Sequence, residues 1–140
     1  MKKLLFTSIF LMFSFRLYAQ EVPFNLEITN IRNNQGHIIV GICAGSKEFT
    51  GSNTCRYLFS MPATKGTIIK DLNIVKGSYA ILVFHDENDN QKLDTAMFGK
   101  PTEYYGFSNN TYGPYGTKPE YNAAVINIDG HSNAVIKLRK

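Results

Sequence analysis

The sequence predicts an all-β protein, an antiparallel β-sandwich of seven short strands with one long ordered loop. Apolar residues recur at the two-residue period of half-buried strands, and clusters of Gly, Pro, Asn and Asp separate these segments. No segment after residue 20 has the period of an amphipathic helix. The loop is expected over residues 85–121, which show neither the two-residue period of a strand nor the period of a helix. These residues include too many aromatic side chains for a disordered segment.

The N-terminus predicts a secretory signal peptide over residues 1–19, followed by a single domain over residues 20–140. Lys2 and Lys3 precede an apolar run over residues 4–15, and Ala19 supplies a small residue for cleavage. The run is shorter than the ~20 residues that span a bilayer, so a membrane anchor is the weaker alternative. We therefore expect an exported protein, periplasmic or secreted, with no membrane span after signal removal.

The charge balance argues against nucleic acid as a partner. The whole chain has 15 basic and 11 acidic residues and a formal net charge of +4. Lys2, Lys3 and Arg16 lie in the predicted signal peptide, which leaves 12 basic residues and a net charge of about +1. Without a clear basic surplus we expect no nucleic-acid binding.

Cys43 and Cys55, the two cysteines of the chain, are expected to form a disulfide. An even number of cysteines in an oxidising compartment favours a bridge, which here would close a short polar loop. Such a bridge stabilises a fold by ~2–3 kcal/mol. The alternative is two free buried thiols, and the spacing excludes a metal site of the Cys-x-x-Cys kind.

The first three strands are expected over residues 24–31, 37–44 and 56–61. Phe24, Leu26 and Ile28 alternate with polar residues. The turn signal over residues 33–36 predicts a hairpin between the first two strands. Pro62 ends the third strand because proline cannot donate to a sheet.

Four more strands are expected over residues 66–72, 78–84, 123–128 and 133–138. The strand at 78–84 is apolar almost throughout, as expected for a central strand packed on both faces. Tyr79 at its start is a candidate tyrosine corner, with an ordinary core tyrosine as the equal alternative. Asp129-Gly130 predicts a hairpin between the last two strands.

The long loop begins with oxygen-bearing side chains at alternate positions, a pattern typical of Ca²⁺ binding. These candidate ligands are Asp86, Asn88, Asn90 and Asp94, at positions one, three, five and nine of an EF-hand-like loop. Such a site, with few carboxylates, binds Ca²⁺ at ~10⁻⁴–10⁻³ M. The alternative is a hydrogen-bonded turn, since Asp and Asn also bond to their own backbone.

Two residues depart from the EF-hand pattern. Gln91 stands where that loop has glycine, and Met97 where it has a bidentate glutamate. Glu103 is the residue that we expect to fold back and replace the missing ligand.

His85 is the candidate for a catalytic role. It ends the central strand beside Asp86, and a carboxylate from Asp86 or Glu103 could orient it as a general base. No nucleophile motif accompanies it, so a hydrogen-bonded histidine at a strand end is the favoured alternative.

The second half of the loop is rich in aromatic residues. Tyr104, Tyr105 and Phe107 are the candidate ligand-binding residues among them, together with His85. The favoured alternative is that these rings close one end of the sandwich as a second small core, because the loop must bury apolar surface to stay ordered.

Part of this sequence closely resembles the family of exported bacterial proteins catalogued as domain of unknown function 2141. The residues that carry the resemblance are Tyr79-Ala80, His85-Asp86-Glu87-Asn88-Asp89-Asn90, Leu93-Asp94, Phe98-Gly99, Pro101, Glu103 and Tyr105-Gly106-Phe107-Ser108-Asn109. The family commonly has glycine where this chain has Asp89 and Gln91. The resemblance implies a small β-sandwich, immunoglobulin-like or transthyretin-like, in the bacterial envelope, and it brings no catalytic residue.

We therefore expect a non-enzymatic, exported binding or accessory module with a Ca²⁺-stabilised loop. Its expected partner is a glycan or an envelope protein. The first alternative is an envelope-directed enzyme that uses His85 with a neighbouring carboxylate, and the second is a purely structural accessory domain.

Overall fold

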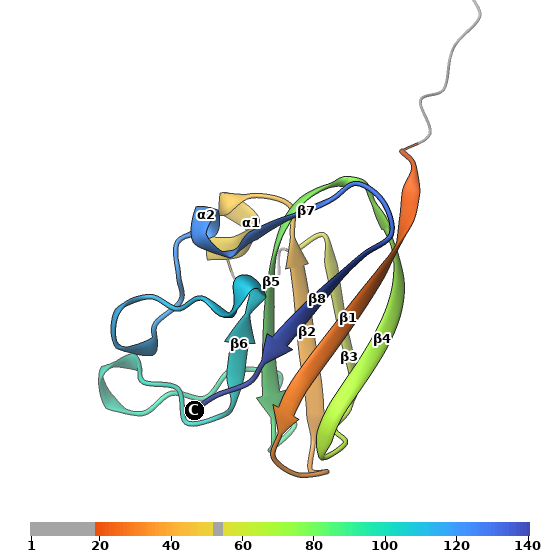
Figure 1. The fold of residues 1–140 in the computed structure, drawn as a ribbon. Coiled ribbons are helices and arrows are strands. Elements are labelled where there is room, and N and C mark those ends of the chain that lie inside the picture. The colour runs from red at the N-terminus through yellow and green to blue at the C-terminus, as the bar shows by residue number, and fades with distance from the viewer. Residues whose placement is uncertain (1–18, 52–54) are drawn as a thin grey trace, which may run out of the picture.

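The computed structural model describes residues 19–51 and 55–140 (Figure 1). Its strands are β1 (Glu21–Ile31), β2 (His37–Cys43), β3 (Tyr57–Pro62), β4 (Gly66–Val75), β5 (Gly77–Asp86), β6 (Tyr105–Phe107), β7 (Val125–Ile128) and β8 (Ser132–Lys137). Its helices are α1 (Ser46–Thr50) and α2 (Tyr121–Ala124), with 3-10 turns η1 (Met97–Gly99), η2 (Ser108–Asn110) and η3 (Pro114–Gly116). The mainly β prediction is confirmed, but the described residues form eight strands rather than seven. The additional strand is β6, which lies inside the predicted loop.

The strands form two sheets (Figure 1). One sheet has three strands in the order β4-β1-β8, and the other has the order β3-β2-β5-β6 with β7 also paired to β5. The two short strands both pair with β5. β7 lies beside residues 77–80 of that strand, and β6 lies beside residues 82–84. The pairing of β1 with β8 is parallel, which corrects the expectation of a wholly antiparallel arrangement.

Both predicted hairpins are wrong. β1 and β2 belong to different sheets, as do β7 and β8, so each of these turns carries the chain across the core. The alternation of a strand fixes which face is buried, but it does not fix which strand lies beside it. Gly36 allows the first crossing, because its φ is +65° and a Cβ there would lie 1.9 Å from the carbonyl oxygen of Asp86.

The main core lies between the two sheets. It is built from inward-facing residues of both sheets, among them Phe24, Leu26, Val40 and Ile81. The hydroxyl of Tyr79 donates a hydrogen bond to the carbonyl oxygen of Val75, at 2.7 Å, across the turn that enters β5. The tyrosine corner is therefore confirmed.

A second apolar cluster covers the outer face of β5. It contains the buried residues Cys43, Phe49, Ala80, Phe84, Tyr105, Phe107 and Ala124. The two clusters explain why β5 is apolar almost throughout, as predicted. They also confirm that aromatic residues of the long loop form a second small core.

Residues 1–18 of the predicted signal peptide lie outside the described residues. Within the part of the chain that the structure describes, no helix is long and apolar enough to cross a membrane.

Candidate functional site

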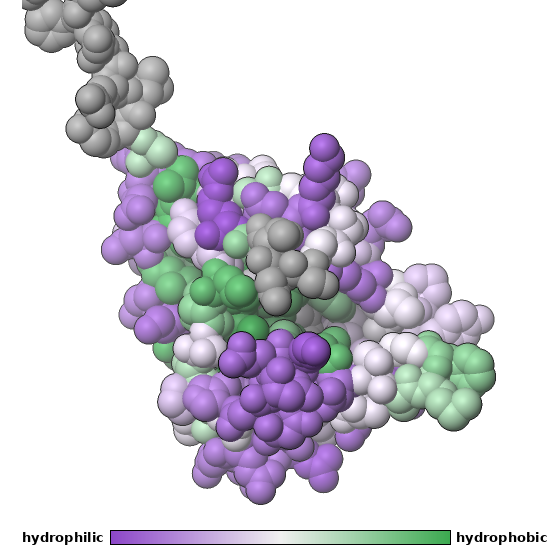
Figure 2. Space-filling model, turned by 180° about the vertical axis from the view of Figure 1, so that it is seen from behind, coloured by the Kyte–Doolittle hydropathy of each residue, from purple (hydrophilic) through white to green (hydrophobic). Residues whose placement is uncertain are grey.

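A groove of about 1170 Å³ lies on the outer face of the five-stranded sheet, the face turned away from the main core. We call it the outer groove. Figure 2 shows this side of the molecule, with hydrophobic surface in the hollow and hydrophilic side chains around it. Its floor is formed by Ile39 of β2, Leu58 and Ser60 of β3, Leu82 and Phe84 of β5, and Tyr105 and Phe107 of β6.

The apolar floor follows from strand alternation. Ile38 and Val40 point into the main core, so Ile39 between them points outward, and Leu82 lies likewise between two core residues of β5. The solvent side of an antiparallel sheet is normally polar. Here Leu58 is 50% exposed, and Ile39 and Leu82 are only half-buried. Among residues 19–51 and 55–140, the side chains thus leave part of this apolar floor accessible.

Two loops and the end of α1 form the walls. One wall comes from the long loop, with Leu93, Thr95 and Pro101, and another from residues 116–118. On the rim, Nδ1 of His37 lies 2.5 Å from Oδ1 of Asp89. Lys92 also lines the groove. The site therefore combines an apolar floor with a polar and partly basic rim.

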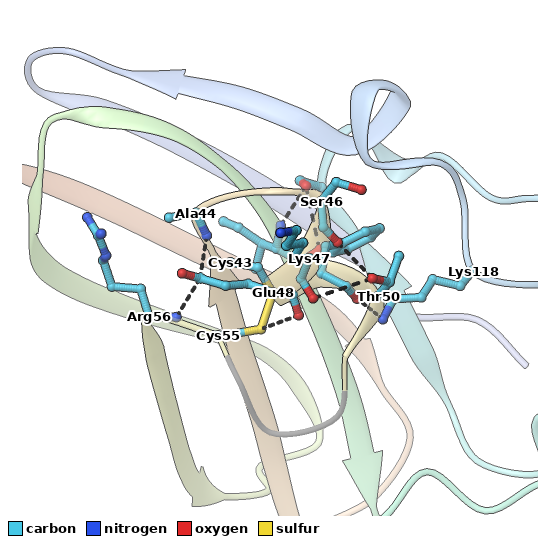
Figure 3. Close-up of a disulfide and its surroundings, with 12 residues drawn as sticks. Cys43, Ala44, Ser46, Lys47, Glu48, Thr50, Cys55, Arg56 and Lys118 are labelled. Atoms are coloured by element: carbon cyan, nitrogen blue, oxygen red, sulfur yellow. Dashed lines mark hydrogen bonds between the residues drawn. A yellow bond between two sulfur atoms is a disulfide. The ribbon is translucent and has the colours of Figure 1, made fainter.

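The predicted disulfide between Cys43 and Cys55 is present, with an S–S distance of 2.04 Å (Figure 3). The bridge and the carboxylate of Glu48 join the end of β2 to the start of β3. Glu48 accepts hydrogen bonds from the backbone N–H of Ala44 at 2.7 Å and of Arg56 at 2.9 Å. Because Cys55 lines the outer groove, the bridge fixes the position of one residue at its edge.

Lys118 connects the opposite wall to α1. Its ammonium donates a hydrogen bond to the carbonyl oxygen of Phe49 and lies 4.6 Å from the centre of the Phe49 ring (Figure 3). Burial of the amine lowers its pKa below the ordinary lysine value. Lys118 therefore holds the loop in place and adds positive charge to the rim.

The start of the long loop is organised by Asp86, which is 1% exposed. Its carboxylate accepts hydrogen bonds from the backbone N–H of Asn90 at 3.1 Å and of Gln91 at 2.7 Å. Asp89 and Gln91 have φ values of +59° and +62°. These are the two positions at which the resembled family commonly has glycine, and such a backbone favours glycine.

The carboxylate of Asp94 accepts hydrogen bonds from the two asparagines of the predicted metal loop. Oδ2 of Asp94 accepts a hydrogen bond from the side-chain amide of Asn88 at 2.7 Å, and Oδ1 accepts one from Asn90 at 2.9 Å. The structure thus brings Asn88, Asn90 and Asp94 together through side-chain hydrogen bonds.

Glu103 folds back onto this loop as an acceptor of backbone hydrogen bonds. It is 6% exposed, and its two oxygens accept hydrogen bonds from the backbone N–H of Glu87 and of Asp94, each at 3.0 Å. Burial raises the pKa of the Glu103 carboxyl above its ordinary value, while these two hydrogen bonds act in the opposite direction. Glu103 therefore connects the start of the loop to its return.

Within the described ranges, no three or more His, Cys, Asp or Glu side chains are arranged so as to hold a metal ion. The carboxylates of Asp86, Asp94 and Glu103 instead accept hydrogen bonds from the loop itself. This arrangement is the one expected of the hydrogen-bonded turn.

His85 is completely buried behind the turn that follows β1. Its Nε2 lies 2.7 Å from the carbonyl oxygen of Gln35, and its Nδ1 has no hydrogen-bond partner and lies 3.9 Å from Oε1 of Glu87. The catalytic alternative required an accessible histidine in a pocket, and the structure does not place His85 in the outer groove.

The predicted aromatic residues, two in β6 and one directly before it, point to opposite sides of the sheet. Tyr105 and Phe107 are 4% and 6% exposed and form part of the groove floor. Tyr104 packs against the main core instead, with the guanidinium of Arg32 5.9 Å from its ring centre. Neighbouring strand residues point to opposite faces, so these three side chains cannot form one ligand surface.

The groove itself was not predicted from the sequence. Its floor brings together Ile39, Leu58 and Leu82 from three strands, and its rim adds Lys92 and Lys118. The available signal was the apolar residue at the outward position of each predicted strand. That signal could show an uncovered apolar face, but it could not show which loops would enclose it.

Comparison with known proteins gives the family. Residues 26–136 match the model of a family described as "Uncharacterized protein conserved in bacteria (DUF2141)". No curated protein and no solved structure matches the chain. The match covers most of the sequence, so this chain belongs to the DUF2141 family, as the resemblance indicated.

Proposed function

We propose that this member of the DUF2141 family is an exported, non-enzymatic binding module, and that the outer groove is its ligand site. One observation carries the proposal: the outer face of a sheet, which is normally polar, here presents Leu58 at 50% exposure beside the half-buried Ile39 and Leu82. Concave sites with a mainly apolar lining and a few placed polar groups are typical ligand sites.

The lining favours a ligand with an elongated apolar body and an acidic end. Apart from Ser60 and the Tyr105 hydroxyl, which already donates to Gly116, the floor is aliphatic or aromatic carbon, so it gives a sugar few hydrogen-bond partners, and burying unpaired hydroxyl groups is costly. An acyl chain or a run of apolar side chains from an envelope protein fits the floor better. Lys92 and Lys118 on the rim would attract an acidic group on such a ligand.

The disulfide supports export. Structural disulfides persist in oxidising compartments such as the periplasm or the extracellular space. Fractionation of cells that express the whole chain, followed by alkylation of free thiols, tests this part of the proposal. An exported, alkylation-resistant product is expected, and a cytoplasmic product with free thiols would overturn it.

The groove is tested with a fluorescent naphthalene sulfonate, which has an apolar body and an anionic end. We expect its fluorescence to rise on binding to the mature protein and expect Leu58→Lys to abolish the rise. The matched control is Ile69→Lys, at a position that is 61% exposed on the other sheet. Equal binding by both variants would exclude the outer groove as the site.

We also propose that Ca²⁺ stabilises the long loop through Asp86, Asn88, Asn90, Asp94 and Glu103. The support is that the side-chain amides of Asn88 and Asn90 both point at the carboxylate of Asp94. If each amide rotated by half a turn, its oxygen would take the place of its nitrogen, and two amide oxygens would then lie beside this carboxylate as ligands for a cation. Thermal unfolding in EDTA and then in millimolar Ca²⁺ tests the proposal. A rise in Tm that Asp94→Ala removes is expected, and an unchanged Tm would leave the loop as a hydrogen-bonded turn.

A further inference from the structure

Two turns in the long loop share one backbone design. In the first, Gly99 N–H donates to the carbonyl oxygen of Ala96 at 3.2 Å, and Ala96 N–H donates to that of Lys100 at 2.8 Å. In the second, residues 113–117 repeat both bonds at 3.2 Å and 2.9 Å. Each turn places an aromatic residue at its third position, Phe98 in the first turn and Tyr115 in the second.

Both aromatic residues occupy a backbone region that bulky side chains rarely adopt. The φ of Phe98 is +64° and that of Tyr115 is +56°, each followed by a glycine with positive φ. Neither ring is used by the fold, since Phe98 is 100% and Tyr115 101% exposed, and the neighbouring Met97 is 80% exposed. Strained residues that pack against nothing in the domain are typical of functional sites.

The two turns lie at the same end of the molecule (Figure 1). Between them is a small cleft of about 180 Å³, which both turns line and to which the C-terminus also contributes. The hydroxyl of Tyr105 donates a hydrogen bond to the carbonyl oxygen of Gly116 and so fixes the second turn to β6. Figure 2 shows a hydrophobic projection at this end of the molecule. We call Phe98 and Tyr115 the aromatic tips, and the exposed Met97 lies next to Phe98 in the chain.

The charge beside the aromatic tips is basic. The residues that line the small cleft include Lys100, Arg139 and Lys140, and none of the described residues that line it has an acidic side chain. The guanidinium of Arg139 is held over the ring of Tyr112, at 3.3 Å from its centre. The end of the molecule therefore presents apolar rings that project beyond a cluster of cations.

We propose that the aromatic tips and these cations dock the protein on the surface of an anionic membrane. Aromatic residues settle at the level of the lipid head groups, and basic residues beside them are attracted to anionic lipids. Surface binding of this kind combines buried apolar area with charge attraction, and no membrane span is involved. The strained turns favour this role because they hold the rings outward, away from the domain. This inference does not depend on a ligand in the outer groove.

The chain contains no tryptophan, so a single one can report on contact with lipid. We would place it by Phe98→Trp in the mature protein, with Ile69→Trp on the three-stranded sheet as the control. With phosphatidylcholine vesicles that contain phosphatidylglycerol, the emission of Phe98→Trp should shift to the blue and be quenched by brominated lipid. Emission that stays unshifted, or an equal shift in the control, would overturn the proposal.

Two further variants separate the contributions of the rings and the charges. Phe98→Ser with Tyr115→Ser should abolish sedimentation with anionic vesicles. Lys100→Glu with Lys140→Glu should weaken it by at least about tenfold. Tm values equal to that of the unmodified protein would show that all four substitutions leave the fold intact. Equal binding to neutral and anionic vesicles would contradict the proposal, as would sedimentation with insoluble peptidoglycan in place of vesicles.

Discussion

The outer faces of the two sheets differ, although the same two-residue alternation builds both. On the three-stranded sheet, β1 turns Asn25 and Glu27 outward, and the amide of Asn25 donates a hydrogen bond to Asp71 of β4 at 2.7 Å. On the five-stranded sheet, the equivalent outward positions of β2 and β5 hold Ile39 and Leu82. The first face exposes Ile69 at 61% and Val135 at 43%, but its polar side chains suit it to contact with water. The second is apolar and only partly covered by the described residues, which is why we propose it as a ligand site.

The largest expected effect separates the main core from the groove floor. Leu26 is completely buried, so Leu26→Ala should lower the free energy of unfolding by ~2–5 kcal/mol. Leu58 is 50% exposed, so Leu58→Ala should cost only ~0.5 kcal/mol. Urea unfolding of both variants measures the difference. Similar losses would mean that Leu58 belongs to the core and not to an open site.

Removal of the disulfide should affect both stability and the groove. Its sequence separation is 12, so a Cys43→Ala/Cys55→Ala variant should lose ~3 kcal/mol of stability. The same variant should bind the naphthalene sulfonate more weakly, because Cys55 lines the groove. A reductant should destabilise the unmodified protein and leave the variant unaffected. A variant that loses stability but binds the probe unchanged would contradict the placing of the disulfide at the edge of the groove.

The tyrosine corner should contribute less than the disulfide. Tyr79→Phe removes only the hydroxyl that donates to Val75, so the free energy of unfolding should fall by ~1 kcal/mol. Tyr115→Phe, at a fully exposed ring, is the matched control and should leave stability unchanged. Chemical denaturation of the two variants tests the assignment, and equal effects would contradict it.

The smallest effect concerns Glu103 and depends on pH. Its pKa is raised above the ordinary 4.5, so the native state binds this proton more tightly than the unfolded state does. The resulting stabilisation is fully present below the unfolded pKa and is lost as the pH rises through the folded pKa. The stability of the unmodified protein relative to Glu103→Gln should therefore increase on acidification from neutral pH. A relative stability that falls on acidification would show that the pKa is lowered instead.

The residue pattern was sufficient for properties that belong to one strand or one loop. The two buried faces of β5, the corner at Tyr79 and the pairing of Cys43 with Cys55 all followed from local composition and spacing. In each case a short segment contains the physical cause.

Properties that depend on segments far apart in the sequence could not be predicted from local residue patterns. β1 pairs with β8 and β4 rather than with β2, because the packing of whole apolar faces decides which strands are neighbours. β6 is only three residues long and has too short an alternation to identify. The outer groove unites Leu58, Leu82 and Lys118, which no local pattern connects.

The most direct test of the outer groove is an NMR titration of the isotope-labelled mature protein with decanoate, an apolar chain with one acidic end. Amide signals of β2, β3 and β5 around Ile39, Leu58 and Leu82 should shift, together with those of Lys92 and Lys118. Signals of β1, β4 and β8 should stay in place. Shifts confined to the three-stranded sheet, or none at all, would contradict the assignment of the outer groove as a site for apolar ligands.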